Sequence, residues 1–209
     1  MAGGGITKIR GITLSPDAEV YMPAEDTLLM IDALSELPSS LEGLNCLDVG
    51  TGTGILAIYM AKLGCYTVAA DISIRAAHLA RINSEMNGTY VEAVQGDLMS
   101  YFRDSSFHII TFNPPYIPEE IDSNIELSVA WAGGSNLGRE LIDRFLEQLP
   151  RLLKEGGVSF LLNSSLNNPE LTLRKIEELG MHGSIIKRLK LPFHELIVWK
   201  ISRGRTGHL

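Results

Sequence analysis

Apolar and polar positions alternate along the chain with two different periods. Short runs rich in Val, Ile and Phe are typical of buried strands, and longer segments with apolar residues three and four apart are typical of helices. From residue 45 onward these two kinds of segment follow one another in turn. This order predicts an α/β fold in which helices cover both faces of a mostly parallel sheet.

The pattern predicts seven strands and five helices. The strands are expected at residues 45–49, 66–70, 89–95, 107–112, 157–163, 183–191 and 194–202. The helices are expected at residues 24–37, 54–63, 73–88, 136–153 and 169–179. Because the last two strands have no helix between them, we expect a C-terminal antiparallel hairpin within a seven-stranded sheet.

Local signals mark the ends of the predicted helices. Asp26 or Thr27 would cap the N-terminus of the first helix, and Pro38 would end it. Ser73 is expected to cap the helix after the second strand, and the Asn-Gly pair at 87–88 is a stop signal.

The length of the chain predicts a single domain, residues 1–209, because it is too short for two well-buried ones. Within it, residues 1–43 would form an N-terminal leader and helix. The longest irregular stretch, residues 113–137, has the length of a functional loop, and we expect it to bind substrate.

Composition and charge narrow the possible functions. The formal net charge is -7 at pH 7, so the chain as a whole would not attract a nucleic acid backbone. Neither a targeting signal nor an apolar run of about 20 residues is visible, which predicts a cytoplasmic protein without a membrane segment. Cys46 and Cys65 lie in apolar surroundings and are expected to be reduced core thiols; no metal site is indicated.

A glycine-rich turn, LDVGTGTG at residues 47–54, ends the first predicted strand and opens a helix. Such a turn lets a ligand lie against the main chain, although a tight turn without a ligand is the alternative. A dinucleotide site would need a small residue where this chain has Ile55, and a P-loop would need a lysine. The residues of the turn predicted to bind a cofactor are Asp48, Gly50, Thr51, Gly52 and Gly54.

Acidic residues follow the next two predicted strands. Asp71 is placed to accept hydrogen bonds from both hydroxyls of a ribose, and Asp97 from the exocyclic N–H of an adenine. Helix capping is the alternative for each. With their neighbours Ile72 and Leu98, they complete a site for a nucleoside without a phosphate-binding element. This combination points to S-adenosylmethionine.

The fourth predicted strand ends in NPPY, residues 113–116. The side-chain oxygen of Asn113 and the carbonyl of Pro114 would accept the N–H bonds of a planar NH2 group and turn its lone pair toward a methyl donor. Tyr116 would offer a flat face for the planar group. Asn113 is also expected to contact the cofactor. A plain turn leaving the strand is the alternative.

These motifs resemble those of class I methyltransferases. More narrowly, VYMPAEDTLLMIDAL at 20–34, NPPYIP at 113–118 and AWAGG with GRELIDRFL within 130–146 resemble the short archaeal and eukaryotic branch of the HemK type. The resemblance implies a Rossmann-like fold and methylation of the side-chain amide (N5) of a glutamine in a class-1 translation termination factor. It also favours Thr27, at the start of the first helix, as a cofactor contact.

The resemblance implies a protein partner as well. In the strand order usual for this fold, the strand near Tyr90 to Gln95 lies at a sheet edge and carries no Lys or Pro to discourage pairing. Relatives work with a small zinc-containing activator protein that pairs along this edge. A loop or a terminus of the chain itself is the alternative cover.

Three other functions are less favoured. A nucleic acid methyltransferase acting on adenine N6 or guanine N2 would use the same tetrapeptide. Such an enzyme also needs elements that contact the groove and flip out the base, and the single long loop of this chain is too small to provide them. A dinucleotide-dependent oxidoreductase conflicts with Ile55. An inactive binding scaffold would show damage in the glycine turn or in NPPY, and both are intact.

Overall fold

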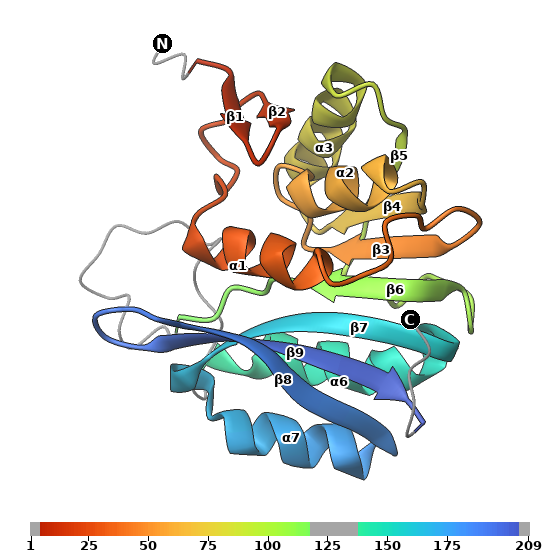
Figure 1. Ribbon diagram of the computed structural model, residues 1–209, viewed down its shortest axis with the longest axis vertical. Coiled ribbons are helices and arrows are strands. Elements are labelled where there is room, and N and C mark those ends of the chain that lie inside the picture. The colour runs from red at the N-terminus through yellow and green to blue at the C-terminus, as the bar shows by residue number, and fades with distance from the viewer. Residues whose placement is uncertain (1–4, 118–137, 205–209) are drawn as a thin grey trace.

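The computed structural model describes residues 5–117 and 138–204. Its main sheet contains β3 (Asn45–Val49), β4 (Tyr66–Asp71), β5 (Val91–Gln95), β6 (Phe107–Phe112), β7 (Leu153–Ser164), β8 (Met181–Lys190) and β9 (Glu195–Arg203). Their order is β5-β4-β3-β6-β7-β9-β8, parallel from β5 to β7 and antiparallel at β9 and β8. The predicted seven-stranded fold with its C-terminal hairpin is confirmed (Figure 1).

Helices pack on both faces of this sheet. They are α1 (Glu25–Leu34), α2 (Ile55–Lys62), α3 (Ile74–Met86), α6 (Glu140–Leu152) and α7 (Pro169–Glu178), with a 3-10 turn, η1, at Ser165–Asn167. α1 and α2 share an apolar cluster with Ile109 and Phe160, whereas α6 shares another with Phe112 and Leu161. Alternate residues of β6 and β7 therefore fill a core on each side of the sheet. Within the described ranges, no helix is long and apolar enough to cross a membrane.

The first helix differs from its prediction at both ends. α1 starts after Ala24 and ends before Ser35, so neither Asp26 nor Thr27 caps it, and Pro38 lies beyond its end. Both residues lie inside the first turn, where the Asp26 carboxylate accepts a hydrogen bond from the Thr27 backbone N–H. The cap at Ser73 and the stop at 87–88 are confirmed for α3.

The leader contains a hairpin that the sequence pattern did not predict. Strands β1 (Thr7–Ile9) and β2 (Ile12–Leu14) pair antiparallel and are joined by a two-residue turn. Three residues are too few to display a period of two. Asn87, the C-cap residue of α3, exchanges two hydrogen bonds with the backbone of Thr13, at 2.9 and 2.7 Å. The leader is thereby attached to α3 before the chain enters α1.

Cys46 and Cys65 form a disulfide, so the prediction of reduced thiols was wrong. Cys46 lies in β3, and Cys65 directly precedes β4, the neighbouring strand. The parallel register pairs Cys46 with Thr67, which brings the two cysteines to a Cα separation of 6.1 Å. Apolar surroundings had indicated burial correctly, but the strand register that makes the cysteines neighbours is not visible in the sequence.

Candidate active site

A cavity of about 560 Å3 opens beyond the carboxyl ends of β3, β4 and β6. The predicted site residues that line it are Thr27, Asp48, Gly50, Thr51, Gly52, Asp71, Ile72, Asp97, Leu98, Asn113, Pro114 and Tyr116. Thr27 and Tyr116 begin and end a 90-residue stretch of the sequence, and the fold brings both to the same cavity. This is expected, because the carboxyl ends of parallel strands meet at one edge of a sheet. Residues 118–137 of the predicted substrate loop lie outside the described residues.

The glycine turn connects β3 to α2 and reaches across to β4. Gly52 donates its backbone N–H to Oδ2 of Asp71 at 3.0 Å. Gly54, the remaining predicted cofactor residue, packs against α3: a Cβ there would lie 2.8 Å from the Cα of Ala80. This close approach and a φ of 84° explain why position 54 needs glycine, while its contact with the cofactor stays a prediction.

Asp71 ends β4 and holds the turn on both sides. Its Oδ2 accepts from Gly52, and its Oδ1 accepts from the backbone N–H of Ser73 at 2.9 Å. Burial raises the pKa of the Asp71 carboxyl, and the backbone hydrogen bonds oppose this rise. Each carboxylate oxygen has a second lone pair, so both remain able to accept from a ligand. The ribose contact stays a prediction that this geometry permits.

Asp48 is fully buried and braces the same turn. Its Oδ2 accepts from the Thr51 hydroxyl and its Oδ1 from the Thr111 hydroxyl, both at 2.7 Å. Burial raises the pKa of Asp48 to about 6; the two hydroxyls oppose the rise and the nearby Asp71 adds to it. Both oxygens therefore already have protein partners, and the side chain links the glycine turn after β3 to Thr111 of β6.

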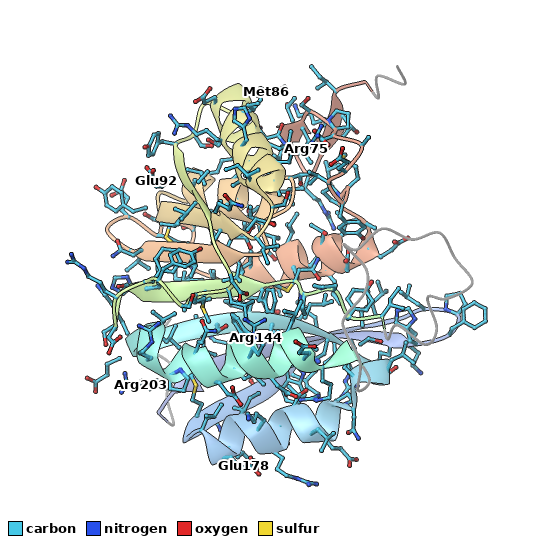
Figure 2. The ribbon with its side chains drawn as sticks, turned by 180° about the vertical axis from the view of Figure 1, so that it is seen from behind. Arg75, Met86, Glu92, Arg144, Glu178 and Arg203 are labelled. Atoms are coloured by element: carbon cyan, nitrogen blue, oxygen red, sulfur yellow. A yellow bond between two sulfur atoms is a disulfide. The ribbon has the colours of Figure 1, made fainter. Side chains whose placement is uncertain are left out.

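Asp97 follows β5 and forms an ion pair with Arg144 of α6. Both side chains line the cavity, and Figure 2 shows Arg144 on the helix that covers the sheet from behind. The carboxylate predicted to accept from an adenine is thus held by a guanidinium. Arg144 is one of several charged residues on α6, and no local pattern distinguishes it from the others, so the sequence did not reveal it.

Asn113 follows β6 and directs its carboxamide toward the first turn of α1. Its Nδ2 donates to Oδ2 of Asp26 at 3.2 Å and to the Thr27 hydroxyl at 3.4 Å. Its Oδ1 is buried and has no hydrogen-bond partner in the described part of the protein. Asn113 itself lines the cavity, so this unpaired oxygen is the candidate acceptor for a donor on a bound ligand.

Tyr116 closes the NPPY stretch at the cavity wall. Its carbonyl accepts from Nδ2 of Asn167 at 2.7 Å, and its ring centre lies 6.0 Å from that of His194. Burial, together with the nearby Asp26, raises the pKa of the Tyr116 phenol. The ring is therefore a neutral aromatic surface, which suits contact with a planar group rather than a role as a base.

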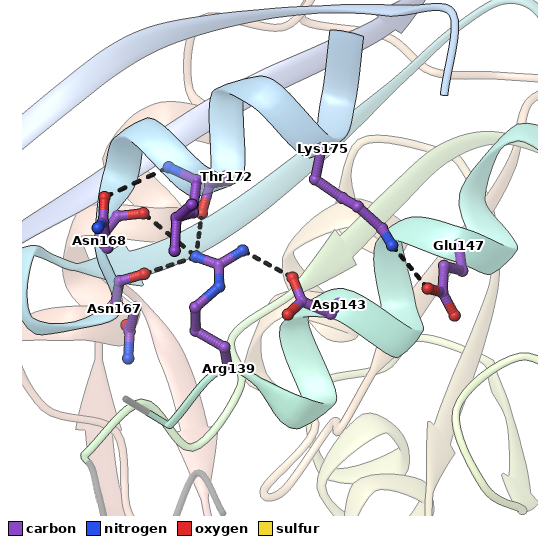
Figure 3. Close-up of polar contacts among 8 residues, drawn as sticks. Arg139, Asp143, Glu147, Asn167, Asn168, Thr172 and Lys175 are labelled. Carbon is purple, nitrogen blue, oxygen red and sulfur yellow. Dashed lines mark hydrogen bonds and ion pairs between the residues drawn. The ribbon is translucent and has the colours of Figure 1, made fainter. Parts of the chain in front are cut away.

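Asn167 also binds Arg139, the second residue after the segment 118–137. Arg139 donates from Nη1 to the carbonyl of Asn167 and to the Thr172 hydroxyl, and from Nη2 to Asp143 (Figure 3). Its side chain is only 6% exposed. The chain is therefore fastened to the same 3-10 turn just before residue 118, at Tyr116, and just after residue 137, at Arg139.

The charge of the cavity lining is unbalanced. The acidic residues among the described lining are Glu19, Asp26, Asp48, Asp71 and Asp97. Arg144 is the one basic residue of that described lining. Such a lining suits a cationic ligand and disfavours a diphosphate. Tyr21 and Asp26 also line the cavity and were not predicted as site residues, although both lie in the stretch at 20–34 that carries the family resemblance.

Comparison with known proteins gives the family. Residues 25–182 match the family model described as Methyltransferase small domain. A protein of Methanocaldococcus jannaschii, provisionally named a protein N5-glutamine methyltransferase, is 39% identical over 94% of this chain and 100% of its own length. Human methyltransferase HEMK2 is 34% identical over 80% of this chain and 82% of its own.

A solved structure extends the likeness to the fold. It is the E. cuniculi Mtq2-Trm112 complex, described as responsible for methylation of the translation termination factor eRF1. The match has 31% identity and a TM-score of 0.71, and it covers 89% of this chain and 99% of that chain. The chain belongs to the Methyltransferase small domain family and is a HemK2/Mtq2-type, S-adenosyl-L-methionine-dependent methyltransferase. The predicted family and cofactor are thereby confirmed.

Proposed function

We propose that this HemK2/Mtq2-type methyltransferase methylates the side-chain amide nitrogen, N5, of a glutamine in a class-1 translation termination factor. The observation that carries the proposal is the buried Oδ1 of Asn113, which has no hydrogen-bond partner in the described part of the protein and belongs to a residue that lines the cavity. The names of the M. jannaschii and E. cuniculi proteins, which mention N5-glutamine and eRF1 methylation, support this choice of substrate.

The acceptor nitrogen needs orientation more than it needs a base. The lone pair of an amide nitrogen is delocalised, so both N–H bonds must be engaged for the lone pair to face the donor. Oδ1 of Asn113 would accept one N–H and the carbonyl of Pro114 the other. The neutral ring of Tyr116 would lie against the amide plane. The proton becomes acidic after transfer, so none of these groups has to remove it first.

The cofactor fits the acidic lining of the cavity. S-adenosyl-L-methionine, when bound, supplies an electrophilic methyl group on a positively charged sulfonium. The residues that would hold it are Thr27, Gly50, Gly52, Asp71, Ile72, Asp97 and Leu98, all of which line the cavity. The carboxylates favour a cation there. The main chain at Gly50 has a φ of 62°, a conformation that favours glycine, and a Cβ at this position would lie 3.3 Å from the Phe112 ring.

A labelled-methyl transfer assay tests the substrate. The protein would be given labelled cofactor and a termination factor carrying Gly-Gly-Gln, with the Gln→Ala factor, total DNA and ribosomal RNA as parallel acceptors. We expect label in the Gly-Gly-Gln factor alone. Label that enters nucleic acid, or that survives the Gln→Ala change, would show that another acceptor is used.

The free edge of β5 would bind a small zinc-containing activator protein. β5 lies at the end of the sheet and pairs with β4 on one side, as predicted for the strand near Tyr90 to Gln95. Ile74 and Tyr90, close to this edge, are 61% and 64% exposed. A strand added by a partner would satisfy the open backbone groups of β5 and cover these side chains. The E. cuniculi relative was solved in complex with Trm112.

Co-expression with the zinc-containing protein tests this partner. We expect the two chains to co-elute and the Ile74→Asp variant to release the partner. Phe193→Asp is the matched control, because Phe193 is 93% exposed but lies on the β8–β9 hairpin, at the other edge of the sheet. Equal retention of the partner by both variants would place its binding surface elsewhere.

A further inference from the structure

Asp26 lies against Asn113, and the cofactor and acceptor contacts proposed above give it no role. We infer that Asp26 is a positioning residue: it sets the orientation of the Asn113 carboxamide so that Oδ1, and not Nδ2, faces the acceptor nitrogen. The inference rests on the proposed function for the nature of that nitrogen. It adds a second residue, which does not touch the acceptor, to the group that makes transfer possible.

A carboxamide needs such a partner because its two ends have nearly the same shape. One end accepts hydrogen bonds and the other donates them, and rotation by half a turn exchanges the two. If Asn113 presented its NH2 group to the cavity, two donors would face each other at the acceptor nitrogen. A site that relies on the oxygen of Asn113 therefore requires a group that selects one of the two orientations.

Asp26 selects the orientation through its charge. Its Oδ2 lies 3.2 Å from Nδ2 of Asn113, and an ionised carboxylate can only accept. The Thr27 hydroxyl donates its single proton to Oδ1 of Asp26 at 3.1 Å, so toward Asn113, at 3.4 Å, it also acts as an acceptor. Asp26 and Thr27 both act as acceptors at this end of the carboxamide, so the NH2 group of Asn113 must point toward them. The oxygen is left without a partner in the described part of the protein, on a residue that lines the cavity.

The Asp26 carboxylate is itself fixed in place. Oδ1 accepts from the Tyr21 hydroxyl at 3.0 Å and from the backbone N–H of Thr27 at 2.6 Å. Asp26 is only 3% exposed, so water does not compete for it. Stabilisation of the α1 N-terminus would account for the bonds of Oδ1, but not for the bond of Oδ2 to a residue 87 positions away. That bond is the one that orients Asn113.

The Asp26→Asn variant tests the inference with almost no change of shape. Its Oδ1 would keep the bonds from Tyr21 and Thr27, so its new NH2 group would replace Oδ2 and face the NH2 group of Asn113. We expect Asn113 to turn over and methyl transfer to fall about 10- to 100-fold, because a hydrogen-bond acceptor is replaced by a donor at the reacting nitrogen. Affinity for S-adenosylmethionine should stay within about threefold of wild type.

Asp32→Asn is the matched control for the loss of a negative charge on the same helix. Asp32 lies in α1 and forms an exposed ion pair with Arg10. This variant should transfer methyl groups at the wild-type rate. The inference is wrong if Asp26→Asn also transfers within about threefold of wild type, or if it loses cofactor affinity in proportion to its loss of transfer.

A second measurement does not depend on turnover. The side-chain NH2 protons of Asn113 can be identified because their signals are absent from the Asn113→Ala variant. Their exchange with solvent should be slow in wild type and fast in Asp26→Asn, where the NH2 group would face the cavity. Fast exchange in wild type, or no change in the variant, would overturn the role of Asp26. If wild type fails to methylate the glutamine, the proposed substrate is wrong, and this exchange measurement still decides whether Asp26 orients Asn113.

Discussion

Replacement of Arg139 by Met removes a buried guanidinium on which four acceptors depend. Arg139 is 5% exposed and donates to the carbonyls of Asn167 and Asn168, to Thr172 and to Asp143 (Figure 3). Methionine has a similar volume, so the expected loss comes from the acceptors left without donors and not from a void. This cluster joins the start of α6 to the start of α7.

The magnitude follows from the burial of the partners. Breaking a buried ion pair costs about 3–5 kcal/mol. The Asp143 side chain is 38% exposed, so water replaces part of its lost bond and we expect the lower end, about 3 kcal/mol. For a chain of this length that loss lowers Tm by about 6–12 °C.

Lys175→Met provides the matched control, because Lys175 of α7 pairs with Glu147 of α6 across the same two helices (Figure 3). These two side chains are 29% and 56% exposed, so the expected cost is about 0–1 kcal/mol. Urea unfolding followed by circular dichroism, with thermal unfolding in parallel, measures both variants. If Arg139→Met and Lys175→Met prove equally stable, the burial argument is refuted.

Three further predictions concern stability and the wall of the cavity. The pKa of Asp48 is about 6, above its ordinary value of 3.8, so protonation of Asp48 stabilises the folded state by about 3 kcal/mol below about pH 4. This contribution is lost as the pH rises through 6, and the difference in unfolding free energy between wild type and Asp48→Asn should therefore change across that range. A difference that stays constant with pH contradicts the prediction. The Cys46–Cys65 disulfide closes a loop of sequence separation 19, so its reduction should lower the free energy of unfolding in urea by about 3 kcal/mol. Free thiols in the unfolded protein before reduction would rule out the disulfide. Asn167→Ala removes the donor to the Tyr116 carbonyl, so KM for the termination factor should rise while affinity for the cofactor stays unchanged. An unchanged KM would show that Asn167 does not influence substrate binding.

The sheet and its helices were predictable because their signals are local. Alternating apolar segments of strand and helix length determine α/β topology almost alone, and the cap at Ser73 is a signal within four residues. Carboxyl ends of parallel strands meet at one edge of a sheet, so the strand pattern alone predicts that Asp71 and Asn113 lie at the same site, as they do. The residues that matter most to the proposal were therefore visible in the sequence.

The contacts that the sequence did not reveal join segments that lie far apart in the chain. The contact of Asp26 with Asn113 and the ion pair of Arg144 with Asp97 join elements far apart in the chain. A local pattern assigned Asp26 to a helix cap, because an acidic residue in a first turn looks the same whether it points along the helix or across to another strand. Gly54 shows the same difficulty, since glycines needed for packing and for ligands share one motif, and its contact with the cofactor stays a prediction.

The central claim, that the oxygen of Asn113 holds the acceptor nitrogen, is tested most directly by Asn113→Ala. Calorimetry would give its affinity for S-adenosylmethionine, and labelled-methyl transfer to the Gly-Gly-Gln termination factor would give its rate. We predict cofactor affinity within about threefold of wild type and a rate lower by about 100-fold or more. Transfer at the wild-type rate, or a loss no greater than the loss of cofactor affinity, would contradict the account.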